Sequence, residues 1–250
     1  MPADDRAWEL SLLSSADRER LASDPVLVDA LRAALPGPEF AVTAAGLMVQ
    51  VPAGVDQPVS AGREVRARIA TMLHDPQVAA TLLKDGSRVV VVPKDEAMTS
   101  LDAFRHLRGV AIADGRTWDT TRGAGGKTAA VTEENLLGEV TGLQGHNGYA
   151  DGYSTTTHEF AHTIHQYGLS DADRRIITAA YQAKKALGTS VQWPDGYRLV
   201  DPKDPEGELI DNYSSTNEYE YFAQATNAYL GTNFGNDRTT GQPGTTNPAG

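Results

Sequence analysis

Apolar residues in the first third of this chain recur mostly at helical spacing. From Ala7 to Leu35 most of them lie at helical spacings, and a break at Ser23-Asp24-Pro25 divides this stretch into two predicted helices. A second helical stretch runs from about Ala61 to Leu83. An interruption is predicted there at His74-Asp75-Pro76, because proline has no N–H to donate and clashes with the preceding turn. The N-terminal region is therefore expected to be mostly helical.

Strand-like segments are few and short. Arg88 to Pro93 contains four consecutive valines and follows Gly86, a β-branched run that is typical of a buried strand. Glycines are dense from Gly109 to Lys127, which predicts a loop or a bent ribbon. Thr128 to Val131 is expected to follow it as another strand.

Three further helices are predicted in the second half of the chain. The first begins near Ser154 to Thr157, whose hydroxyl groups can cap free N–H groups, and it ends around Tyr167-Gly168. The second starts at the capping sequence Ser170 to Asp173 and reaches Leu187-Gly188. A last helix is expected near Asn217 to Leu230.

The composition narrows the possible partners and the possible metal ligands. With 33 acidic and 22 basic residues, the net charge of -11 disfavours binding to nucleic acid or to an anionic membrane. No run approaches the roughly 18 apolar residues that a membrane-spanning helix needs. Cysteine is absent, so any metal must be held by His, Asp or Glu. Met1 to Arg6 show no signal-peptide pattern, which fits either a cytoplasmic protein or a chain without its leader.

The strongest chemical signal is the pentapeptide His158-Glu159-Phe160-Ala161-His162 on a predicted helix. Two histidines four residues apart lie on one helix face, about one turn apart, so both can reach one ion. In a zinc hydrolase, a glutamate such as Glu159 takes a proton from the attacking water and passes it to the leaving amine. The pattern predicts the zinc site of a hydrolase, and the alternative is two histidines that merely share a face.

A third metal ligand has to come from elsewhere, because catalytic zinc usually takes three protein ligands and leaves one position open. In metzincins a histidine follows ten residues after the first one, but this chain has Gly168 there. Gluzincins use a glutamate from a later helix, and Asn217 to Ala223 contains both Glu218 and Glu220. Two residues apart on a helix, they point to different sides, so only one can face the ion, and spacing alone does not choose between them.

A family resemblance distinguishes these two glutamates. The pentapeptide His158 to His162, followed by Tyr213 to Ala223, resembles the catalytic domain of anthrax lethal factor and the related bacterial Pro-Pro endopeptidases. In that family, a glutamate ligand directly precedes an aromatic pair and an alanine, and a catalytic tyrosine lies seven residues before it. Glu220 and Tyr213 match these two positions.

The resemblance covers roughly Gly109 to Leu230, and Gly115 to Asp119 is similar to the stretch ahead of the edge strand in the Pro-Pro endopeptidases. Glu218 is then expected to face solvent or to support the site from outside, and the alternative for Tyr213 is an ordinary packing tyrosine. The resemblance implies that His158, His162 and Glu220 are the Zn²⁺ ligands. It also implies that Glu159 is the general base and that Tyr213 stabilises the oxyanion.

One position departs from the family pattern. The family commonly has an acidic residue three positions after the second histidine, where this chain has His165. His165 lies one turn beyond His162 and is expected at the surface. The other interpretations are that it supports a ligand, contacts the substrate or is itself an alternative ligand. His74, His106 and His146 have no matching spacing, so they are expected to have ordinary structural roles. For His146, in the loop before the motif helix, the alternative is a position near the cleft.

These observations and the resemblance predict an α+β fold. We expect a zincin-like metalloprotease catalytic domain at 101–232, after a mostly helical region at 1–100 and before a flexible tail at 233–250. An edge strand near Thr128 to Glu133 would hold an extended peptide by main-chain hydrogen bonds. The expected activity is zinc-dependent hydrolysis of a peptide or protein substrate. There are three alternatives: a zinc-dependent amidase acting on a non-protein substrate, a non-enzymatic module, and a toxin-like effector domain with the same site.

Overall fold

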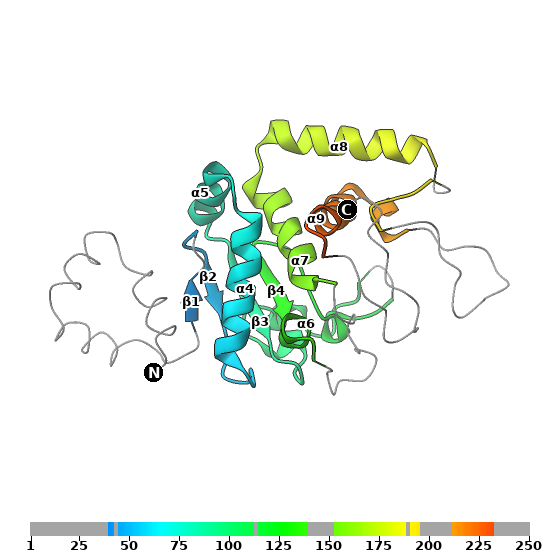
Figure 1. Ribbon diagram of the computed structural model, residues 1–250. Helices are drawn as coiled ribbons and strands as arrows, with labels where there is room; N and C mark the ends of the chain where they lie inside the picture. The colour runs from blue at the N-terminus through cyan, green and yellow to red at the C-terminus, as the bar shows by residue number, and fades with distance from the viewer. Residues whose placement is uncertain are drawn as a thin grey trace, which may run out of the picture.

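Helices pack against one four-stranded sheet in this α+β protein (Figure 1). The computed structural model describes residues 40–42, 45–112, 115–139, 153–188, 191–195 and 212–232. The helices predicted before residue 36 and the tail predicted at 233–250 lie outside these residues. Within the described part of the chain, no helix combines the length and the apolar character needed to cross a bilayer.

The sheet has the strand order β1-β2-β3-β4. Its strands are β1 (Phe40–Val42), β2 (Met48–Gln50), β3 (Arg88–Val92) and β4 (Thr128–Thr132). β1 pairs antiparallel with β2, whereas β2, β3 and β4 run parallel. The strands predicted at β3 and β4 are confirmed, but the hydrophobic pattern does not reveal β1 and β2, because three residues are too few to show an alternation. Strands from both sides of residue 100 thus share one sheet.

The long helices follow the predicted pattern closely. They are α4 (Pro58–Met72), α5 (Pro76–Asp85), α7 (Thr155–Thr163), α8 (Asp171–Ala186) and α9 (Glu218–Tyr229). The interruption between α4 and α5 is confirmed: Asp75 accepts a hydrogen bond of 2.7 Å from Gln77 N, and Pro76 occupies the first turn of α5. A short helix that the sequence did not predict, α6 (Glu133–Leu137), follows β4 directly.

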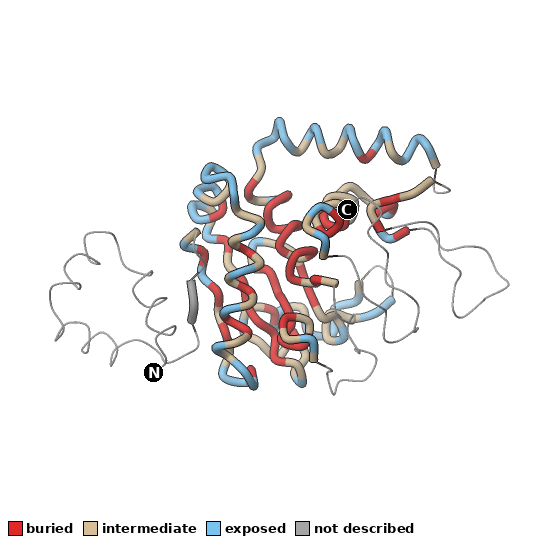
Figure 2. Tube along the Cα trace, in the orientation of Figure 1, coloured by how far each residue is buried: buried red, intermediate tan, exposed pale blue. Residues whose placement is uncertain are grey.

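Both faces of the sheet are covered, which explains the four consecutive valines of β3. Val89 and Val91 belong to a core shared with α4 and α7, whereas Val90 and Val92 belong to a second core with residues of the segment 98–124. Figure 2 shows the buried residues concentrated in the sheet and in α7. The helices contribute apolar side chains to the first core, among them Ala61, Val65 and Ile69 from α4 and Phe160 from α7. The metal motif therefore lies on a helix that is anchored in the main core.

A buried ion pair ties the glycine-rich segment before β4 to the rest of the fold. Arg122 Nε and Nη2 each lie 2.8 Å from an oxygen of the Glu134 carboxylate, and the two side chains are only 11% and 2% exposed. The same guanidinium donates to the carbonyl oxygens of Glu96 (2.5 Å) and Pro93 (3.0 Å), beyond the end of β3. All these contacts hold the backbone immediately before Gly123 in one place.

Replacing Arg122 with methionine should destabilise the protein by about 3–5 kcal/mol, because the Glu134 carboxylate stays buried without its partner. The free energy of unfolding in urea measures this. The matched control is Arg105→Met, since Arg105 pairs with Asp102 on the surface, where the side chains are 65% and 85% exposed. If both variants unfold at the same urea concentration, the buried pair has no special role.

Candidate metal centre

The start of α7 is held by side chains from two other helices. Ser154 caps α7 because its Oγ accepts a hydrogen bond of 3.0 Å from Thr157 N. The same Oγ accepts a second hydrogen bond, of 2.7 Å, from Arg68 Nη1 on α4. Asn135 on α6 accepts from Thr155 N and donates to the carbonyl oxygen of Tyr153, both at 2.8 Å. The cap predicted from the hydroxyl-rich sequence is confirmed, and the helix is fixed before the motif begins.

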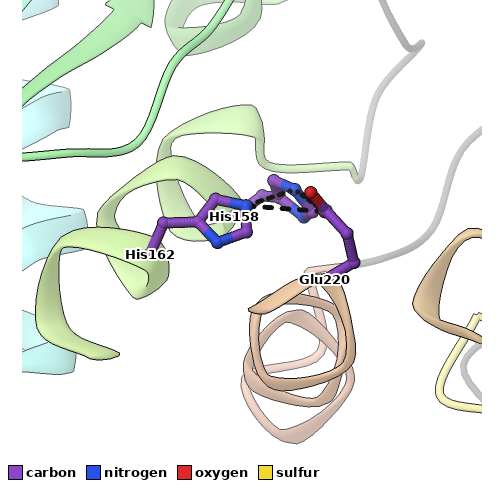
Figure 3. Close-up of side chains that lie close together, drawn as sticks. All are labelled: His158, His162 and Glu220. Atoms are coloured by element: carbon purple, nitrogen blue, oxygen red, sulfur yellow. Dashed lines mark hydrogen bonds and ion pairs between the residues drawn. The ribbon is translucent and has the colours of Figure 1, made fainter. Parts of the chain in front are cut away.

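Three side chains converge between α7 and α9, which lie side by side (Figures 1 and 3). The Nε2 atoms of His158 and His162 are 3.2 Å apart, and Glu220 Oε2 lies 3.0 Å from the first and 3.4 Å from the second. Tetrahedral zinc with bonds of about 2.0–2.1 Å would separate neighbouring donor atoms by about 3.3 Å. The spacing and the chemistry of the three donors therefore fit a zinc ion.

The electrostatics of this cluster also favour a cation. Burial alone would raise the pKa of Glu220, but hydrogen bonds from His158 and His162 outweigh it and hold the pKa at about 2. Burial lowers the pKa of His162, yet the hydrogen bond to Glu220 and the nearby charge of Glu159 raise it overall. Glu220 is thus ionised at neutral pH, as a metal ligand has to be, and a positive charge among the three donors would be favoured.

The capping of α9 decides which of the two glutamates reaches the histidines. Asn217 accepts hydrogen bonds from Tyr219 N (2.9 Å) and Glu220 N (3.0 Å), so α9 begins at Glu218. Glu220 then faces α7 and joins the donor group, and Glu218 does not. Glu218 is half-buried, and its negative charge acts on His165. The structure brings together the residues that the resemblance selects.

The Glu159 side chain lies beside the histidines and against the glycine-rich segment. Burial raises the pKa of this carboxyl, whereas the nearby His158 and His162 lower it. Its carboxylate accepts a hydrogen bond from Gly125 N–H. A Cβ atom at Gly123 would lie 2.6 Å from Glu159 Oε1, so the backbone there approaches the carboxyl directly. This contact gives the group proposed as general base a defined orientation.

At Gly123 and Gly125 the glycine-rich segment crosses α7 at a distance that only glycine permits. A Cβ atom at Gly125 would lie 2.2 Å from His162 Cβ and 2.9 Å from the backbone oxygen of Glu159. The next carbonyl, that of Gly126, accepts a hydrogen bond of 2.7 Å from Thr163 Oγ1. Of the glycines in the predicted loop, Gly123 and Gly125 are therefore required by close packing on α7, whereas a Cβ atom at Gly109 or Gly115 would have no neighbour within 4 Å.

This segment also corrects the predicted edge strand at Thr128 to Glu133. β4 ends at Thr132, and Glu133 begins α6. The outer edge of β4 is occupied at its centre, because Ala124 and Ala130 exchange two backbone hydrogen bonds of 3.2 and 2.8 Å. The preceding residues fold back along β4, so the backbone around Ala124, and not β4 at Ala130, borders the site.

Tyr213 lies near the donor cluster and is open to solvent. It begins the short 3₁₀ turn Tyr213–Ser215, and the residue is 54% exposed. Its ring centroid is 6.0 Å from that of His158. The structure thus places the Tyr213 ring beside one of the three donors, and its role as oxyanion stabiliser stays a prediction.

Two residues beside the three donors are not among those that the sequence predicts. The Tyr153 hydroxyl lies 3.4 Å from His158 Nδ1, and Gln224 Nε2 donates to the same hydroxyl at 3.3 Å. Gln224 follows Glu220 by one helical turn, a spacing that could have pointed to it. Tyr153 directly precedes the cap of α7, and nothing in the local sequence marks it. Both support the ring orientation of His158.

His165 is buried, so the prediction that it lies on the surface is wrong. It is only 1% exposed and packs between the rings of Tyr219 and Phe222, each 5.0 Å away. The α-helix ends at Thr163 and continues as the π-helical segment Ile164–Gly168, which changes the direction of side chains relative to regular helical spacing. Among the described residues, His165 is not part of the metal-donor group.

Two further histidines of the described residues, His74 and His106, do not belong to this centre. His74 and His106 are outside the core, and neither belongs to the donor group found in the described part of the chain. His146 lies outside the described residues.

In the glycine-rich region, Asp119 accepts hydrogen bonds from Thr99 Oγ1 (2.5 Å) and Gly109 N (2.6 Å), so this side chain has a structural role.

Comparisons with known proteins find similarity among solved structures. No family model matches this chain, and no curated protein matches it. The chain is similar to a solved Pro-Pro endopeptidase from Paenibacillus alvei, with 20% sequence identity, a TM-score of 0.48, and coverage of 77% of this chain and 86% of the other. The lethal factor-like assignment stays a prediction, and the function of this chain has to follow from the site itself.

Replacing Gly125 with alanine should destabilise the protein by about 1–3 kcal/mol or more and weaken zinc binding, because the new methyl group displaces His162. Thermal unfolding and a competition assay with a zinc-binding dye measure the two effects. The control is Gly188→Ala: Gly188 has a φ of 82° and no neighbouring atom within 4 Å, so only backbone strain of roughly 1–2 kcal/mol is expected. Unchanged zinc affinity in the Gly125 variant would contradict the tight contact with His162.

Proposed function

We propose that this protein is a zinc-dependent endopeptidase. The observation that carries the proposal is the convergence of His158 Nε2, His162 Nε2 and Glu220 Oε2 within 3.4 Å of one another. Two imidazoles and one carboxylate are a common protein ligand set for catalytic zinc, and they leave a fourth position open. The neighbouring Glu159 and the exposed Tyr213 supply the further groups that hydrolysis of an amide needs.

The residues around the metal centre have distinct roles in this proposal. Bound zinc would supply a Lewis acid for carbonyl polarisation and water activation. Glu159 takes the proton of the attacking water and delivers it to the leaving amine, for which a raised pKa is suited. The Tyr213 hydroxyl donates to the negative charge that develops on the carbonyl oxygen. Gly125 N–H holds the Glu159 carboxylate in place until it accepts the proton.

The path of the peptide follows from the occupied edge of β4. Ala124 directs its N–H and its carbonyl toward Ala130. Along an extended chain, the backbone groups of a neighbouring residue such as Gly123 point to the opposite side. We therefore place the substrate main chain along the outer side of this segment, next to Glu159, in the manner of strand addition.

Zinc loading and peptide cleavage should go together. The purified protein is expected to bind one zinc ion per chain by elemental analysis, to cleave members of a peptide library, and to lose that activity in a chelator and regain it with zinc. Mass spectrometry of the library gives the cleavage sites. Cleavage of small non-peptide amides alone would favour an amidase, and absence of turnover in the zinc-loaded protein would favour a non-enzymatic module; either outcome would overturn the endopeptidase proposal.

Replacing Glu159 with glutamine should lower kcat by at least about 10²–10⁴-fold while zinc content stays the same, because the amide cannot accept the proton. Steady-state kinetics and elemental analysis measure the two quantities. Glu218→Gln is the matched control, since Glu218 is half-buried in the same region but lies outside the donor group. Equal activity of the Glu159 variant and the control would remove Glu159 as the base.

A further inference from the structure

A buried acid with no role in the proposed chemistry lies next to Tyr213. Asp195 is only 3% exposed, and burial raises the pKa of its carboxyl, which indicates that keeping a charge there is costly. Its Oδ2 accepts a hydrogen bond of 3.1 Å from Ser214 N, and its Oδ1 accepts a short one from Ser214 Oγ. The N–H of Tyr213 also donates to this carboxyl. Three donors from two consecutive residues therefore meet one side chain.

The segment that carries Asp195 is itself fixed against α8 and α9. Trp193 is 1% exposed, and its ring lies 6.3 Å from that of Tyr181 on α8 and 6.0 Å from that of Tyr221 on α9. The contact with Tyr221 is edge-on, at an interplanar angle of 90°. Tyr221 directly follows Glu220. Through Trp193, the segment of Asp195 is therefore packed against the helix that carries the proposed third ligand.

The other end of the turn is held by α8. The carbonyl oxygen of Ser215 accepts hydrogen bonds from Tyr181 Oη (2.9 Å) and Lys185 Nζ (2.6 Å). Ser215 Oγ donates to the carbonyl oxygen of Asn212 at 2.7 Å. Backbone N–H groups at the start of the turn and a carbonyl at its end are thus both bound by side chains. Tyr213 itself is more than half exposed, and the bound turn fixes the backbone from which its phenol extends.

We propose that Asp195 is a positioning residue that holds the Tyr213-Ser214 backbone so that the Tyr213 phenol stays beside the metal centre. The proposal rests on the proposed function, in which Tyr213 stabilises the oxyanion. A carboxylate suits this place because it only accepts hydrogen bonds and has several lone pairs for the three donors. An asparagine has one acceptor oxygen, and its NH₂ group would face an N–H or O–H donor.

A double-mutant cycle tests whether Asp195 acts through Tyr213. Tyr213→Phe alone should lower kcat by about 10²–10³-fold, as for other lost oxyanion donors. Asp195→Asn alone should lower kcat by about 10- to 100-fold, with KM and zinc content unchanged, because the phenol is misplaced. In the Tyr213→Phe background, Asp195→Asn should change kcat by less than about twofold, since two residues acting as one unit are not additive.

Backbone amide exchange supplies a readout that does not depend on activity. In Asp195→Asn, the N–H groups of Tyr213 and Ser214 should exchange with deuterium faster than in the wild type, while the amides of α7 stay protected. The control is Asp102→Asn, whose side chain is 85% exposed and which should leave exchange and activity unchanged. Ser214→Ala, which removes only the hydroxyl contact, should have a smaller effect of the same kind if the Asp195 variant does not fold.

The outcomes separate the two proposals. Unchanged exchange at Tyr213 and Ser214, or an equal loss of kcat in both backgrounds, would overturn the role of Asp195 and leave the endopeptidase proposal intact. Loss of zinc in Asp195→Asn would also overturn it, because the acid would then support the metal centre as a whole. Full activity of Tyr213→Phe would remove the oxyanion role of Tyr213 from the proposed function, and the positioning role would fall with it.

Discussion

The attraction between the Glu220 carboxylate and two histidines on a neighbouring helix is the interaction on which the arrangement of this protein depends. Glu220 Oε2 lies 3.0 Å from His158 Nε2 and 3.4 Å from His162 Nε2, and this contact joins α9 to α7. α7 is in turn anchored through Phe160 in the core beneath it. A metal ion in the middle would be held by one helix anchored in the main core and by a second helix, α9, whose Phe222 packs against the same core.

The site is surrounded by irregular backbone, which has no regular hydrogen-bond ladder to hold it. Buried charged side chains hold this backbone instead, since Arg122 binds carbonyls next to the glycine-rich segment and Asp195 binds N–H groups next to Tyr213. A carboxylate and a guanidinium are suited to these places because each offers several acceptors or donors at once. The glycine-rich segment adds a second device, since Gly125 allows the backbone to touch His162.

Much of the fold could be predicted from the pattern of residues. The helices at α4, α5, α7, α8 and α9 and the strands β3 and β4 carry periodicity, capping residues and proline or glycine boundaries that are all local. The three-residue strands β1 and β2 carry too little pattern, and their place depends on partners far along the chain. His165 was wrongly expected at the surface, because a π-helical segment follows Thr163 and turns that side chain toward α9.

The sequence by itself determined which side chains are candidates for the site. These are a His-Glu-x-x-His helix, two glutamates on a later helix and a tyrosine seven residues before one of them. Helical spacing is a local property, so these candidates can be recognised without knowledge of the fold. Only the tertiary structure decided that Glu220 and not Glu218 meets the histidines, that the edge of β4 is occupied by Ala124, and that Asp195 reaches the turn of Tyr213. Each of these depends on how distant segments pack, and no spacing along one segment encodes it.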